Sequence, residues 1–118
     1  MADAGLFVGF GWPVRGRESQ AAELFNEVLA YYGRLQEEGE IEGFEPVFLE
    51  PHGGDLGGFI LLRGDPERLA RLRVSDEFVQ YSIRAQLCVE SFGVVGADLG
   101  ERLQRQIAYF TEQIGALA

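Results

Sequence analysis

Apolar residues alternate or cluster in four short stretches of the chain, and they recur at helical spacing in three longer segments. Residues 6–12, LFVGFGW, predict a strand that is apolar on both faces. After Pro13 and the turn at residues 16–19, apolar residues fall three or four positions apart and predict a helix that Gly39 ends. The apolar stripe of this helix consists of Ala21, Leu24, Phe25, Val28, Leu29, Tyr32 and Leu35.

Two β-rich runs follow, residues 41–50 and 58–63, and the connection between them reads EPHGGDLGG. Two such runs around a glycine-rich connection predict an antiparallel hairpin. Asp65 before Pro66 then predicts a capped helix start, because the carboxylate can accept from free backbone N–H groups. Ser75 interrupts this second helix and restarts it.

Residues 92–97, FGVVGA, predict the last strand, and residues 99–117 predict a final helix with a narrow apolar seam. The element order is therefore βαββαβ with a terminal helix. We expect one domain over residues 1–118, with its core in residues 6–98. This order predicts an α+β, ferredoxin-like fold, in which helices cover one face of a four-stranded antiparallel sheet.

Both faces of the expected sheet carry large apolar residues, although an open antiparallel sheet usually has one polar face. Along the second strand, for example, Phe44 and Phe48 alternate with Val47 and Leu49. A second apolar layer is needed, since large exposed apolar patches are rare in monomers. We predict a homodimer in which two sheets pack face to face. The alternative is that the helix of residues 99–117 folds back over its own sheet.

Four features of the chain bear on its family: the order of the elements, the FVGFGW opening strand, the SDEFVQY restart of the second helix and the FGVVG last strand. In these features the chain resembles the dimeric α+β barrel superfamily over about residues 6–98. That superfamily includes cofactor-free antibiotic-biosynthesis monooxygenases, stress-responsive barrels, chlorite-degrading haem enzymes and uncharacterised members. The resemblance implies a ferredoxin-like dimer, often with a pocket for a small, mostly apolar molecule between sheet and helices. It implies a fold and leaves the function open.

Composition excludes several classes of partner and site. Ten basic and nineteen acidic residues give a net charge of -9, which disfavours nucleic acid and anionic membranes as partners. All ten basic residues are arginine, so lysine Schiff-base chemistry is excluded. One cysteine and one histidine cannot build the usual zinc site. No apolar run reaches the ~20 residues that span a bilayer, and we expect a cytoplasmic protein without metal or cofactor.

The only histidine, His52, lies in the glycine-rich hairpin connection, three residues before Asp55. One interpretation is a catalytic base whose imidazole Asp55 orients. The other is a solvated turn, in which Asp55 bonds its own backbone. Haem ligation would use the same imidazole, but a mobile hairpin is a poor place for it.

Five further residues are candidate ligand contacts, and each has a structural alternative. Trp12 at a strand end and Tyr81 beside inward-facing helix positions either line a pocket or pack in the core. Arg15, at the entrance of the first helix, either binds a small anion or lies in solvent. Arg63 and Arg84 either anchor a ligand or pair with some of the many acidic residues.

Three functions remain open from the sequence. The first is binding of a small apolar or aromatic molecule in a pocket of the barrel, without catalysis. The second is a cofactor-free monooxygenase or isomerase, in which His52 or a tyrosine moves a proton on such a molecule. The third is a structural or regulatory dimer without a ligand.

Overall fold

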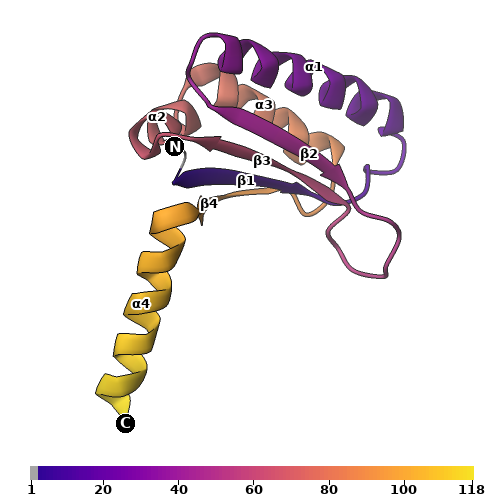
Figure 1. Ribbon diagram of the computed structural model, residues 1–118. Helices are drawn as coiled ribbons and strands as arrows, with labels where there is room; N and C mark the ends of the chain where they lie inside the picture. The colour runs from indigo at the N-terminus through magenta and orange to yellow at the C-terminus, as the bar shows by residue number, and fades with distance from the viewer. Residues whose placement is uncertain (1–2) are drawn as a thin grey trace.

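A computed structural model describes residues 3–118 of the chain (Figure 1). Its elements, in chain order, are β1 (Ala4–Phe10), α1 (Glu18–Glu37), β2 (Gly43–Phe48), β3 (Gly58–Gly64), α2 (Pro66–Arg73), α3 (Asp76–Cys88), β4 (Gly93–Asp98) and α4 (Gly100–Leu117). The strands form an antiparallel sheet in the order β2-β3-β1-β4. This is the predicted ferredoxin-like arrangement, and that prediction is confirmed.

Helices α1 and α3 cover one face of the sheet, where the core lies (Figure 1). The buried strand residues Leu6 and Val8 of β1 pair with Leu62 and Ile60 of β3, so all four point toward the helices. Leu62 is 0% exposed. From the helices, Tyr31, Tyr32, Leu35 and Phe78 complete this core. Burial of these large apolar groups fixes the register of the sheet, because a one-residue slip would turn them to the opposite face.

The first strand ends two residues earlier than predicted, at Phe10 instead of Trp12. The backbone N–H of Gly11 donates to the carbonyl of Glu90 at 2.7 Å, and the N–H of Glu90 donates to the carbonyl of Trp12 at 2.9 Å. The segment after β1 therefore leaves the sheet ladder and pairs with the chain that follows α3. Alternating hydrophobicity did not reveal this change of partner, because the new partner lies far along the sequence.

The second helical region is two helices, and only the first has the predicted side-chain cap. The Asp65 carboxylate accepts from the backbone N–H groups of Glu67 and Arg68, at 3.1 Å each. The Ser75 hydroxyl instead donates to the carbonyl of Leu72 at 2.7 Å. Ser75 therefore stabilises the end of α2, and its hydroxyl does not cap α3.

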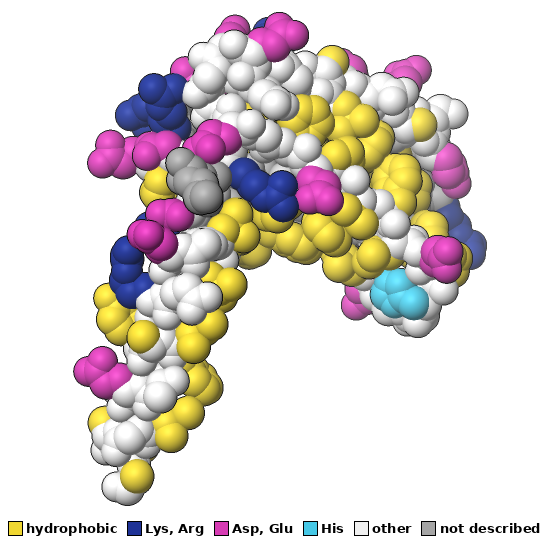
Figure 2. Space-filling model, in the orientation of Figure 1, with side chains coloured by type: hydrophobic (Ala, Val, Ile, Leu, Met, Phe, Trp, Pro, Cys, Tyr) yellow, Lys and Arg dark blue, Asp and Glu magenta, His cyan; other side chains and the backbone are white. Residues whose placement is uncertain are grey.

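The opposite face of the sheet is apolar and is not covered by any helix of the described chain (Figures 1 and 2). We call it the open face. On it the rings of Phe7 and Phe59 stack with centroids 5.0 Å apart, and Val95 is 55% exposed. The open face consists of Phe7, Val47, Phe59, Leu61, Val95 and Ala97, with Glu45 and Arg63 at one side.

The terminal helix α4 does not fold back over the open face, which was the alternative to a dimer. It leaves the end of β4 and projects away from the sheet on the side opposite to α1 and α3 (Figure 1). None of its residues is buried. The molecule thus has a hooked shape, with the open face and α4 on either side of a hollow (Figure 2).

Candidate functional site

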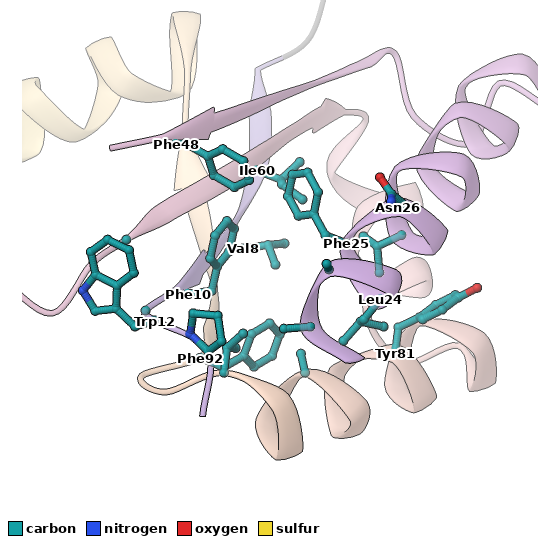
Figure 3. A pocket seen from close by; sticks show the side chains of 18 of the residues that line it. Val8, Phe10, Trp12, Leu24, Phe25, Asn26, Phe48, Ile60, Tyr81 and Phe92 are labelled. Carbon is teal, nitrogen blue, oxygen red and sulfur yellow. The ribbon is translucent and has the colours of Figure 1, made fainter. Parts of the chain in front are cut away.

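A cavity of about 580 Å³ lies between the helix-covered face of the sheet and the helices α1 and α3 (Figure 3). Its floor is Val8 and Ile60 of the sheet, and its walls come from α1, α3 and the segments at the end of β1. It opens to solvent, since Trp12 is 52% and Phe48 69% exposed. A volume of this size is typical of sites for small organic molecules.

Local backbone packing places the mouth of this cavity. The Gly57 N–H donates to the carbonyl of Phe10 at 2.8 Å, which brings the hairpin connection against the end of β1. A Cβ atom at Gly11 would lie 2.8 Å from the backbone oxygens of both Asp55 and Glu90. Only glycine fits between these two backbones. Gly11 therefore allows a close crossing of three chain segments next to Trp12 at the mouth.

Three phenylalanines from three different elements form one wall of the cavity (Figure 3). The ring of Phe25 in α1 lies 4.9 Å from that of Phe48 in β2, and both lie about 6 Å from Phe10 in β1. Phe92 lies on the other side of Phe10 (Figure 3). Together these rings give the cavity an aromatic wall, which suits a planar aromatic ligand.

Polar groups around the cavity are few. The hydroxyl of Ser82 already donates to the carbonyl of Phe78 at 2.9 Å. The Glu18 carboxylate accepts from the N–H of Gly16 at 3.0 Å. Burial raises the pKa of Tyr32, which is one of the lining residues, above its ordinary value, so this phenol keeps its proton. It cannot serve as a phenolate base near neutral pH.

The two aromatic residues predicted from the sequence both line the cavity, but at opposite ends. Trp12 lies at the mouth, and Tyr81 lies at the far side with its hydroxyl directed away from Trp12 (Figure 3). The Tyr81 ring packs 5.0 Å from the ring of Tyr31. A ligand of moderate size can therefore pack against the ring of Trp12 or against the ring of Tyr81.

The three predicted arginines do not line the cavity. Arg15 is exposed on the turn before α1. Arg63 lies on the open face, where its guanidinium bonds the Glu45 carboxylate at 3.1 Å. Arg84 lies on the outer surface of α3 and bonds Glu27 of α1. Among residues 3–118 no arginine borders the cavity at all, so its lining lacks a fixed positive charge.

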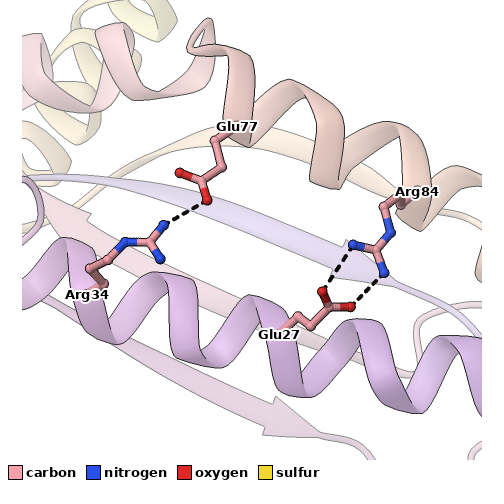
Figure 4. Close-up of polar contacts among 4 residues, drawn as sticks. All are labelled: Glu27, Arg34, Glu77 and Arg84. Atoms are coloured by element: carbon pink, nitrogen blue, oxygen red, sulfur yellow. Dashed lines mark hydrogen bonds and ion pairs between the residues drawn. The ribbon is translucent and has the colours of Figure 1, made fainter.

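Two ion pairs join α1 to α3 across their outer surfaces (Figure 4). Arg84 donates twice to Glu27, at 2.6 and 3.4 Å, and Arg34 donates to Glu77 at 2.7 Å. The hydrogen bond from Arg84 lowers the pKa of Glu27, and its charge adds to this effect. These pairs join the two helices that form the roof of the cavity, and Arg84 is thus paired with an acidic residue, which was the structural alternative for it.

The structure places His52 in the hairpin connection, outside the cavity lining. Its Nδ1 accepts from the N–H of Gly54 at 3.2 Å, and its Nε2 lies 2.8 Å from the carbonyl of Leu56. A neutral ring with the proton on Nε2 satisfies both contacts. Asp55 is not the partner of the imidazole. Both ring nitrogens are thus engaged in stabilising the loop.

Several cavity residues were not predicted from the sequence. Phe10, Phe25, Phe48 and Tyr32 looked like ordinary members of apolar stripes, because their meeting depends on how three elements pack. The one available signal is the density of aromatic residues at the ends of β1 and β2, where FVGFGW and FEPVF occur. In the described part of the chain, no three acidic, histidine or cysteine residues gather as a metal-binding group. None of the helices in that part has the length and hydropathy to span a bilayer.

Comparisons with known proteins identify the fold but no family. No protein-family model matches the chain, and no curated protein sequence does either. Solved structures with a similar fold include a dimeric ferredoxin-like protein of unknown function from Jannaschia sp. CCS1, with 14% identity and a TM-score of 0.60. This chain is covered over 82% of its length and that chain over 98%.

Two other similar structures differ in what is known of them. A dimeric protein of unknown function from Bacteroides fragilis has 10% identity and a TM-score of 0.58, over 81% of this chain and 96% of its own. SnoaB from Streptomyces nogalater, a cofactor-independent oxygenase, has 15% identity and a TM-score of 0.53, over 84% and 95%. The fold resemblance inferred from the sequence is confirmed, and at these identities it concerns the fold alone.

Proposed function

We propose that the chain forms a homodimer that binds a neutral, planar aromatic molecule in the cavity under each sheet. The observation that carries this proposal is a cavity of about 580 Å³ whose lining is rich in aromatic side chains and lacks arginine. Flat apolar walls favour a flat apolar ligand, because each ring face buried against another gains both hydrophobic and quadrupolar stabilisation.

The charge of the ligand follows from the same lining. Glu18 is the one acidic residue of the described chain that lines the cavity, and the chain as a whole carries a net charge of -9. An anionic ligand would therefore lose its hydration without gaining a cationic partner. We infer that Tyr32, which lines the cavity and keeps its proton, donates to one carbonyl or hydroxyl oxygen of the ligand. A neutral aromatic with such an oxygen fits best.

The homodimer part of the proposal depends on the apolar open face. The open face leaves Phe7, Phe59 and Val95 in contact with solvent in a single copy, and a second open face is a complementary surface for them. Two of the similar structures are described as dimeric. The cytoplasmic location expected from the sequence remains part of this proposal, and a single buried cysteine, Cys88, is compatible with it.

Fluorescence of the single tryptophan tests the binding proposal, because Trp12 lies at the cavity mouth. Anthracenemethanol is the neutral probe, and anthracenecarboxylate of the same ring size is the anionic one. We expect saturable quenching of Trp12 by the alcohol and at least about tenfold weaker binding of the carboxylate, from the lost hydration of an unpaired anion.

Two variants separate the cavity from the rest of the surface. Phe48→Ala removes a ring from the cavity wall, whereas Val74→Ala changes an exposed residue between α2 and α3. The first should weaken binding of the alcohol about tenfold or more, and the second should leave it unchanged. Equal binding of both probes, or equal binding by both variants, would contradict the proposal.

Cofactor-independent oxygenation of the bound aromatic is the second candidate, because SnoaB has this fold and is described by that activity. Such a reaction needs a proton acceptor beside the ligand, and Glu18 is the carboxylate that lines the cavity. Oxygen consumption with a phenolic ligand should then fall in Glu18→Gln and persist in His52→Ala. Loss only in His52→Ala would restore His52 as the base. Ligand binding without oxygen consumption would indicate a binding protein. Absence of both ligand binding and oxygen consumption would indicate a structural dimer.

A further inference from the structure

Helix α4 carries a complete apolar stripe, and no residue of this helix is buried in its own copy. Leu103, Ile107, Phe110, Ile114 and Leu117 follow each other at alternating steps of four and three residues, and each is between 44% and 88% exposed. This spacing lines up one face of a helix. An apolar stripe stabilises a helix of this kind only when another surface covers the stripe.

The stripe and the open face border the same hollow. In Figure 2, apolar side chains gather on the underside of the sheet and continue along the side of α4 that faces the hollow. Leu99 lies at the junction, because its side chain packs over Gly5 beside Leu61 on the open face. One occupant of the hollow would therefore cover both surfaces together.

A lipid surface is a poor occupant. Helices that lie on membranes carry an excess of basic residues on their polar face. The polar side of α4 has Arg102 and Arg105 against Glu101 and Glu112, and the chain as a whole is strongly acidic. A second copy fits better, because its open face is the surface already expected to pair with this one.

The area of the interface also indicates that α4 takes part in the dimer contact. Four strands of six or seven residues have a planar footprint of roughly 400 Å², at about 4.8 Å per strand and 3.3 Å per residue. A standard interface buries about 800 Å² on each partner. The helix, about 27 Å long and about 10 Å wide, adds roughly 270 Å². The open face by itself is small for a stable dimer.

Helix α4 leaves the sheet where β4 ends, so it passes a side edge of the partner's sheet when the two open faces pack with their strands crossing at a large angle. The edge at β2 carries acidic residues, with Glu38, Glu40 and Glu42 in the preceding segment. The edge at β4 is apolar, because Val79, Ile83 and Leu87 form an exposed row along α3, each 40 to 56% exposed. The apolar stripe of α4 suits the second edge.

A groove of about 250 Å³ runs along that apolar edge between α3 and β4. Its border includes Val79, Ile83, Phe92 and Val94, and also Arg73, whose guanidinium donates to the carbonyl of Val94 at 2.7 Å. A Cβ atom at Gly93 would meet nothing within 4 Å, which leaves room for another backbone to approach the strand. The outer edge of β4 also has no neighbouring strand among the described residues.

We propose that α4 of each copy lies in the α3–β4 groove of the other, so that the two helices clasp the dimer from both sides. This inference rests on the proposed homodimer and extends it to a second contact. A parallel coiled coil of the two α4 helices is incompatible with it, because face-to-face sheets direct the two helices in opposite directions.

Disulfide trapping between two different single-cysteine variants tests the contact. In a Cys88→Ser background, one chain carries a cysteine substitution at Val79, Ile83 or Leu87 and a co-expressed chain carries one at Leu103, Ile107 or Phe110. At least one mixed pair should give a cross-linked dimer, since bonding requires Cα atoms within about 7 Å. Gln104→Cys, on the polar side of α4, should not cross-link.

Other cross-linking patterns would overturn the clasp. Bonding between two Ile107→Cys chains would show a helix pair, and a bond within one chain carrying both substitutions would show a helix docked on its own copy. Absence of every mixed product, with the dimer intact in sedimentation, would show that α4 takes no part in the contact.

Sedimentation equilibrium separates this inference from the dimer itself. Ile107→Glu should raise the dimer Kd by at least about 100-fold, since two copies of each contact are lost, and Gln104→Glu should change it less than about threefold. An unchanged Kd in Ile107→Glu would refute the clasp and leave the sheet dimer standing. A wild-type chain that stays monomeric would refute the dimer and the clasp together.

Discussion

Replacing Val95 with glutamate separates the stability of one copy from that of the dimer. Val95 is 55% exposed on the open face of β4, so in a single copy the new carboxylate can remain in water. Its effect on the folding of that copy should be within about 0.5 kcal/mol, as for other surface changes. In a face-to-face dimer the same carboxylate becomes buried without a partner.

The magnitude follows from symmetry. An unpaired carboxylate costs about 2 kcal/mol or more when it is buried, and a two-fold interface contains two of them. The total of about 4 kcal/mol corresponds to a dimer Kd about 1000-fold higher. Sedimentation equilibrium measures the Kd, and thermal unfolding followed by circular dichroism checks that the single copy remains folded.

Val74→Glu is the matched control, because Val74 is 75% exposed between α2 and α3 and faces neither surface of the sheet. It should leave the Kd unchanged. If Val95→Glu has the same Kd as the wild-type chain, the open face is not the dimer contact, and the inference from its apolar surface is incorrect.

Three further predictions concern the framework of the cavity. Leu62→Ala should lower the free energy of unfolding by about 2–5 kcal/mol in chemical denaturation, because Leu62 is 0% exposed in the centre of the sheet. Gly11→Ala should cost about 1–3 kcal/mol and weaken ligand binding, since its Cβ would lie 2.8 Å from two backbone oxygens. The bond from Arg84 lowers the pKa of Glu27, so this carboxylate stabilises the fold above its unfolded pKa of about 4.5 and loses that effect as the pH falls through its folded pKa. The stability difference between wild type and Glu27→Gln should therefore shrink on acidification, and an unchanged difference would contradict the role of the ion pair.

The fold was predictable because its main determinants are local. The alternation in β1, the spacing in α1 and the Asp65–Pro66 helix start each depend on residues close in sequence. The errors occur where distant segments meet. The prediction that β1 continues to Trp12 was wrong, because Gly11 instead pairs with Glu90.

The candidate site was less predictable, for the same reason. The Phe10, Phe25 and Phe48 rings come together from three elements, and no pattern within one element shows that they meet. The partners of Arg63 and Arg84 were equally hidden, since a chain rich in acidic residues offers many possible pairs. Trp12 and Tyr81 were found as cavity residues because one lies at a strand end and the other beside an inward-facing helix stripe.

The central claim is that the two faces of the sheet have different roles, one bordering the cavity and the other pairing two copies. A methyl-detected NMR titration with anthracenemethanol tests it most directly. We predict shifts for Val8, Leu24 and Ile60, which border the cavity, and none for Val47, Leu61 or Val95 on the open face. Shifts confined to the open-face methyls, or no shifts at all up to the solubility of the probe, would contradict the claim.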